Sequence, residues 1–180
     1  MITIDFEDVF EPIDVAEDLS FMTFNSFIKS NGYVNIKINI TPLLEPLLPN
    51  VYNLSFGPYS KNGEIDDFAK INHSDKNKVF STILLYALTF LQANNEITIG
   101  IDGSDDIRAY LYHRMFKSNK EYLADYFMAI GVDWYLRLLR NDQIELDVSG
   151  SPFFKPKPEP FNYNRASIDL YRYYMFHLKK

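Results

Sequence analysis

Three segments in the first third of the chain have the alternation of apolar and polar residues, or the aromatic and Thr content, that is typical of β-strands. The clearest is 34–40, where Val and Ile occupy every second position and Asn and Lys stand between them. This period of two predicts a strand with one face toward solvent. Segments 20–28 and 52–56 predict two further strands, and Asn31-Gly32 predicts the hairpin turn between the first two. An additional short strand is expected at 2–6.

The pattern then becomes helical. Segment 78–92 is apolar nearly all round, which is typical of a buried helix, and Ser74 or Asp75 is placed to cap it. Isoleucine at every second position of 97–101 predicts a strand. The acidic turn at 102–106 leads into a second helix that begins at Ile107.

The last third of the chain predicts shorter elements. Ser118 and Glu121 have the spacing of a capping box, so a third helix is expected from there to Gly131. Strands are predicted at 134–139 and 144–148, and a short helix at 168–178.

These elements follow the order β-β-β-α-β-α-α-β-β and predict an α+β fold, with helices packed on an antiparallel or mixed sheet. The ribonuclease H-like fold shares part of this order, so the likeness is one of topology at most. We expect a single domain over residues 1–150 and a proline-rich connector over 151–163. A C-terminal helix within 164–180 is expected to dock on the domain or on a partner.

Composition narrows the class of protein. The chain has 180 residues, of which 47% are hydrophobic and 23% charged, so it is globular. Its net charge of −6 disfavours non-specific binding to nucleic acids or anionic membranes. The chain contains no cysteine, which excludes disulfides and cysteine-ligated zinc. We find neither a secretory signal nor an apolar span of about 20 residues, and we therefore predict a cytoplasmic protein without a membrane partner.

Asp102, Asp105 and Asp106 are the candidate metal ligands, because carboxylate oxygens bind Mg²⁺ and Ca²⁺. A strand that ends in Asp also fits a nuclease of the ribonuclease H-like class. Two-metal chemistry needs several converging carboxylates, however, and helix 78–92 has none. We favour the alternative that these acids stabilise the start of the second helix through its dipole, and we expect no cofactor.

Arg108, Tyr112, His113 and Arg114 form a basic and aromatic cluster on the second helix. Arg108 and Tyr112 are four residues apart and so share a face. An Arg and a Tyr in this arrangement can stack on bases or bind a phosphate or carboxylate group. The alternative, which we favour, is an internal role in which Arg108 pairs with Asp105.

The C-terminal segment is rich in large apolar residues. Tyr171, Tyr174, Met175 and Leu178 would lie on the expected helix. If this helix does not dock on its own domain, it exposes an apolar stripe that needs a partner or a second copy of the chain. Both possibilities are open, and a homodimer through this segment is one prediction.

Several segments together resemble an uncharacterised family of small proteins from Bacteroidetes genomes, known as a domain of unknown function. The resemblance is carried by 51–57 (VYNLSFG), 65–67 (IDD), 78–83 (KVFSTI), and Gly103-Ser104 followed by 108–112 (RAYLY). It spans residues 20–140, and the chain departs from it at Asp105-Asp106. The resemblance implies a compact α+β domain and no known activity.

We predict a non-catalytic protein-binding domain, with a partner that could be basic because an acidic protein attracts positive surfaces. The expected setting is bacterial defence, phage biology or a toxin–antitoxin pair. Two alternatives remain open. One is a divalent-metal-dependent enzyme acting on nucleic acid, and the other is a nucleic-acid-binding module that uses Arg108, Tyr112 and Arg114.

Overall fold

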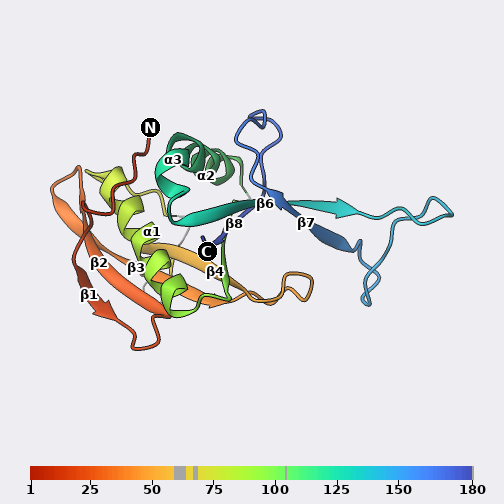
Figure 1. The fold of residues 1–180 in the computed structure, drawn as a ribbon, viewed down its shortest axis with the longest axis horizontal. Coiled ribbons are helices and arrows are strands. Elements are labelled where there is room, and N and C mark those ends of the chain that lie inside the picture. Colours follow the sequence, from red (N-terminus) through yellow and green to blue (C-terminus); the bar gives the residue numbers. More distant parts are fainter. Residues whose placement is uncertain (59–63, 67–68, 104, 180) are drawn as a thin grey trace.

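The computed structural model describes residues 1–58, 64–66, 69–103 and 105–179, which fold into a mixed sheet packed with helices (Figure 1). Within these residues the sheet has eight strands in the order β1-β2-β3-β4-β5-β8-β6-β7. The bounds of the strands are β1 Pro12–Val15, β2 Phe21–Ile28, β3 Gly32–Pro42, β4 Val51–Pro58, β5 Thr98–Asp102, β6 Phe127–Leu136, β7 Phe154–Pro160 and β8 Tyr173–Leu178. The α+β class is therefore confirmed, whereas the ribonuclease H-like topology is not.

Strands β2, β3 and β4 form an antiparallel meander at the site of the three strands expected from alternation. Asn31 adopts a φ of 62° between β2 and β3, a conformation that Asn tolerates better than most residues, and Gly32 follows it. The isoleucines of β3 lie on the buried face, where Ile36, Ile38 and Ile40 are almost fully covered. The alternation of residues in the sequence therefore correctly predicts which face of β3 packs against the core.

Helix α1 (Lys76–Ala93) covers one face of the sheet (Figure 1). Asp75 caps it by accepting a hydrogen bond from the Lys78 N–H at 3.0 Å. The helix connects β4 to β5, and these two strands are parallel, as expected when a helix crosses between them. Most of its apolar residues are buried, which explains why they occur on nearly every side of the helix.

The expected C-terminal helix is wrong, because that segment contains β8. This strand lies in the middle of the sheet, where it pairs antiparallel with β5 and β6. Its side chains alternate between two cores. Tyr174 and Phe176 enter the main core beneath the helices, while Tyr173 and Met175 pack on the opposite face with Val51. Aromatic residues that are buried on both faces of a central strand produce a continuous apolar run, which resembles a helical segment.

Three other expectations also need correction. The third helix is short, with α3 covering Lys120–Leu123, and β6 occupies most of the segment assigned to its second half. The connector 151–163 contains β7, since alternating prolines fit an edge strand. Segment 144–148 forms isolated bridges rather than a strand.

The N-terminal segment is not a strand but an extended strap held by side chains of the helices. The Ile4 N–H donates to Asn119 Oδ1 at 2.8 Å, and the Asp5 N–H donates to Ser81 Oγ at 2.9 Å. Ile4 itself is buried in the main core. The strap satisfies its backbone groups without joining the sheet, so alternation alone misassigned it. Among the described residues, no helix is both long and apolar enough to cross a bilayer.

Candidate functional site

Helix α2 (Asp106–Ser118) carries most of the residues that the sequence singled out, and it begins where β5 ends. Asp105 caps it by accepting a hydrogen bond from the Arg108 N–H at 2.8 Å, and its carboxylate also pairs with the Arg108 side chain. The backbone hydrogen bond from Arg108 is the main reason that the pKa of Asp105 lies below its usual value. This carboxylate therefore acts as a helix cap.

The other two acids have different neighbours. Asp106 forms an ion pair with Arg172 at 2.6 Å. Asp102 lies at the end of β5, and its charge acts on Arg108. In the part of the chain that the structure describes, no three acidic or histidine side chains gather as ligands for a metal ion. The metal site at Asp102, Asp105 and Asp106 stays a prediction, because the three carboxylates do not converge on one point in the described structure.

Arg108 and Tyr112 do share a face, as their spacing predicts, and that face turns inward. Together with Asp102, Asn53 and Ser55 they line a small cavity of about 70 Å³ beside β4. Burial lowers the pKa of Arg108, but the hydrogen bond and charge of Asp105 and the charge of Asp102 raise it overall. These two residues therefore belong to an internal polar cluster.

The segments that carry the family resemblance meet around β4. Phe56 of β4 packs edge-on against Phe80 of α1, with ring centroids 5.8 Å apart. Gly57 lies so close to Asp66 that a Cβ added there would come within 2.4 Å of the Asp66 carbonyl oxygen. The 51–57 segment also contributes to the cavity that holds Arg108 and Tyr112. Asp67 and Ser104, which belong to the same segments, lie outside the described residues.

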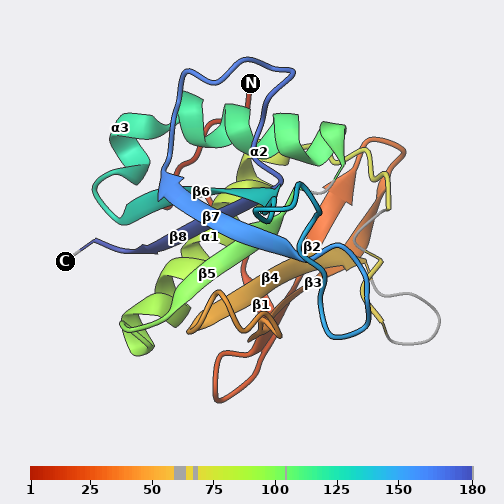
Figure 2. The same ribbon diagram turned by 90° about the vertical axis from the view of Figure 1, so that its right-hand side faces the viewer.

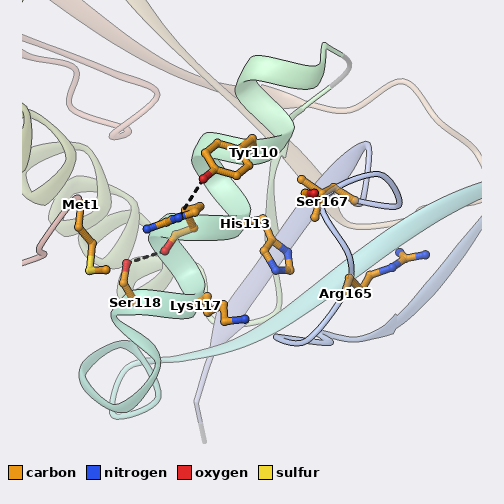
Figure 3. Close-up of a pocket in the computed structure, with 9 residues that line it drawn as sticks. Met1, Tyr110, His113, Lys117, Ser118, Arg165 and Ser167 are labelled. Carbon is orange, nitrogen blue, oxygen red and sulfur yellow. Dashed lines mark hydrogen bonds between the residues drawn. The ribbon is translucent and has the colours of Figure 1, made fainter.

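His113 and Arg114 lie on a different side of α2 and line a larger cleft of about 700 Å³, which we call the α2 cleft (Figure 3). Its lining comes mainly from α2 and from the connection between β7 and β8. That connection arches across the helix near the N-terminus (Figure 2). Its lining residues are Met1, Tyr110, His113, Arg114, Lys117, Ser118, Arg165, Ser167 and Leu170. The basic cluster expected from the sequence is therefore split between two sites.

The β7–β8 connection is fixed in place by Arg165. Its guanidinium donates to Asp133 of β6 at 2.8 Å and to Asp169 at 3.1 Å, and it stacks 4.1 Å from the ring centroid of Tyr171. The side chain thus extends away from α2 (Figure 3). Arg165 builds the wall of the cleft and has its charge balanced by these carboxylates.

The C-terminal residues do not form an exposed apolar stripe. Tyr171 and Tyr174 have no exposed surface, and Met175 is buried on the opposite face of the sheet. The Tyr174 hydroxyl donates to the Ala109 carbonyl oxygen at 2.7 Å, and Leu178 is partly buried against the main core. Of the two possibilities left open by the sequence, the segment takes the one that keeps it within its own fold.

An exposed apolar surface occurs instead on the ends of β6 and β7 and the residues that join them. Residues 134–154, which we call the arm, project beyond the rest of the molecule (Figure 1). The large apolar side chains exposed along it are Trp134, Tyr135, Leu138, Leu139, Ile144, Leu146, Val148 and Phe154. Sequence reasoning missed this surface. The signal was the alternation from Ile144 to Val148, whose apolar side chains stay exposed in the described structure.

One comparison with known proteins identifies a relative of this chain. Residues 10–145 match the model of a family of unknown function (DUF6934). The chain belongs to this family. The match confirms the resemblance to a family of unknown function and extends it at both ends. No curated protein and no solved structure matches the chain.

Proposed function

We propose that this chain is a non-catalytic protein-binding domain and that the arm docks on an apolar surface of a partner protein. The observation that carries the proposal is the exposure of aliphatic side chains along the arm. Leu138 is 66% exposed, Leu146 is 54% exposed, and Val148 is fully exposed. Apolar surface gathered on a projecting segment is typical of an interaction site.

The charges of the arm favour an apolar partner over a basic one. Both carboxylate oxygens of Glu145 accept hydrogen bonds from Lys155 Nζ, at 2.9 and 2.8 Å. The same carboxylate lies 3.8 Å from the guanidinium of Arg137. Asp147 accepts hydrogen bonds from the backbone of Ser149 and Ser151. Because these acids have partners within the arm or next to it, the aliphatic side chains are left as its distinguishing surface.

The geometry of β7 favours binding through side chains over the addition of a strand. The Phe161 N–H donates to the Ala129 carbonyl oxygen, so odd-numbered residues of β7 turn their N–H groups toward β6. Pro156, Pro158 and Pro160 occupy the even positions and leave the outer edge without N–H donors there. A partner strand would find few hydrogen bonds along this edge.

The same structure gives less support to the two alternative functions. A nuclease would need Asp102, Asp105 and Asp106 to converge, and they have separate neighbours. A nucleic-acid module built on Arg108 and Tyr112 would need both at the surface, and both side chains are largely covered beside a small cavity. A role in bacterial defence, phage biology or a toxin–antitoxin pair stays a prediction that suits a small binding domain.

The proposal is tested by comparing binding of the full chain with that of the double variant Leu138→Ser/Leu146→Ser. A partner recovered from the source cell is purified and titrated calorimetrically against each protein. Each buried leucine is worth about 1.5–3 kcal/mol, so we expect affinity to fall about tenfold or more for each leucine replaced.

The matched control is Leu44→Ser, which removes an equally apolar side chain that is 96% exposed outside the arm. It should bind as the unmodified chain does. Light scattering of the isolated proteins tests whether the partner is a second copy, in which case the arm variant becomes monomeric. Equal affinity of the arm variant and the control would overturn the proposal.

A further inference from the structure

The α2 cleft is lined by residues that lie outside the arm. Tyr110, His113, Arg114 and Lys117 occupy positions i, i+3, i+4 and i+7 of α2, so they form one stripe along the helix that faces the cleft. The other wall is the β7–β8 connection, which Arg165 holds against β6. The site is therefore built on a helix and on a connection with a fixed anchor.

The lining of this cleft is positively charged, in contrast to the chain as a whole. The protein has a net charge of −6, yet no carboxylate is found among the described residues that line the cleft. Arg114 donates to the Tyr110 hydroxyl at 2.8 Å and lies over its ring, and neither Arg114 nor Lys117 pairs with a described carboxylate. Two positive charges are thus uncompensated at this place.

His113 supplies a second and separate observation. It is 5% exposed, and both of its ring nitrogens are buried without a hydrogen-bond partner among the described residues. The ring packs against Phe161 with centroids 5.2 Å apart. An unpaired buried polar group is unfavourable, so a ligand that pairs with this imidazole would offset part of that penalty.

We infer that the α2 cleft binds the phosphate group of a small phosphorylated molecule, with Arg114 and Lys117 as the cations and His113 at its base. A phosphate monoester carries a charge of about −1.5 to −2 near neutral pH, which matches the two uncompensated cations. Arginine also recognises phosphate through paired hydrogen bonds. The serine hydroxyls of Ser118 and Ser167 add polar groups to the same lining.

The size of the cleft favours a small molecule as the source of that phosphate. Its volume of about 700 Å³ lies within the range of about 300–1,000 Å³ that is usual for ligand sites. Leu170 and the ring of Tyr110 give apolar contacts for the rest of the ligand. Free phosphate would use the cations alone, whereas a phosphorylated metabolite would use these contacts as well.

The test follows backbone NMR signals of α2 and of residues 165–170 while the full chain is titrated at constant ionic strength. The probes are inorganic phosphate, a nucleoside monophosphate and succinate. We expect saturable shifts with the phosphates, and tighter binding of the monophosphate than of free phosphate. Lys117→Gln and Arg114→Gln should each weaken binding about tenfold, the loss expected for one hydrogen bond to a charged group.

Lys29→Gln is the matched control, because it removes one charge from an exposed residue beside the turn between β2 and β3. It should leave the affinity unchanged, as should the arm variant Leu138→Ser/Leu146→Ser. The arm variant tests protein binding and the cleft variants test phosphate binding, so the result for one proposal does not decide the other. Shifts that do not saturate, an affinity for phosphate that is unchanged in Lys117→Gln, or binding of succinate without phosphate would each overturn the phosphate-binding inference.

Discussion

Strand β8 pairs with β6, and the arm continues from the end of β6; the two carry the same kinds of side chain, which are buried in β8 and exposed in the arm. Every residue of β8 from Tyr173 to Phe176 is buried, because β5 and β6 lie on its two sides and cores lie on both faces. The arm has comparable aliphatic and aromatic residues, but it extends past the sheet and the helices. Most of its large side chains therefore reach solvent.

The difference shows that apolar content alone does not distinguish a core element from an interaction surface. Whether an apolar segment is buried depends on how many neighbouring strands and helices the topology places around it. Strand β6 demonstrates this within one element, since Val132 has no exposed surface while Tyr135, three residues later, is 44% exposed. The change occurs where β6 leaves the cover of the rest of the fold.

Replacing Tyr174 with Ala tests the buried side of this comparison and should have the largest effect. The ring is fully buried and packs against Tyr112 and Phe116. We expect the free energy of unfolding to fall by about 3–5 kcal/mol, as for other large aromatic residues in cores. Urea denaturation measures it. Tyr174→Phe, which removes the hydroxyl bonded to Ala109, should cost about 1 kcal/mol.

The sequence allowed part of this comparison to be predicted. Alternation of apolar and polar residues predicted strands with one exposed face, such as β3. The length of the apolar segment and the cap at Asp75 predicted α1. Strand β8 did not, because burial on both faces removes the alternation. The cluster at Arg108–Arg114 was also visible, but its division between two sites depends on how α2 rotates against the sheet. Arg165 was missed because its position comes from ion pairs with Asp133, 32 residues away.

Adding a methyl group at Gly131 tests how closely Tyr171 packs on β6. A Cβ at this position would approach the Tyr171 ring to 2.2 Å, so the ring or the strand must move. We expect Gly131→Ala to lower the free energy of unfolding by about 1–3 kcal/mol, the usual cost of overpacking. Ser149→Ala, in the exposed arm, is the contrasting change and should have little effect. If both variants unfold at the same urea concentration, the close packing of Tyr171 on β6 is not needed for stability.

The buried side should also respond to pH. Burial is the main reason that the pKa of His113 lies below 6.5, and Lys117 and Arg165 lower it further. Burial, with the charge of Lys76, lowers the pKa of His73 as well. Unfolding lets both imidazoles bind protons more readily, so stability is full above about pH 6.5 and declines as the pH falls below that value.

Chemical denaturation of the unmodified chain and of His113→Phe at several pH values from 8 to 5 measures this response. The variant should lose stability less steeply below about pH 6.5, with the remaining slope coming from His73 and other groups. Parallel slopes in the two proteins would mean that His113 already takes up its proton in the folded state.

The arm should contribute least to stability. Leu138→Ser/Leu146→Ser removes two largely exposed side chains, and surface changes of this kind alter the free energy of unfolding by about 0.5 kcal/mol or less each. Thermal denaturation checks this directly. A large loss would show that the arm packs against the fold in solution and would remove the contrast with β8.

The central position of β8 has a consequence for how the protein is made. Strands β1 to β5 and strands β6 and β7 form two groups that are hydrogen-bonded to each other through β8. Since β8 follows all the other described strands along the chain, both groups are synthesised before the strand that unites them. Until β8 pairs with β5 and β6, each group presents an open edge that can join the wrong neighbour.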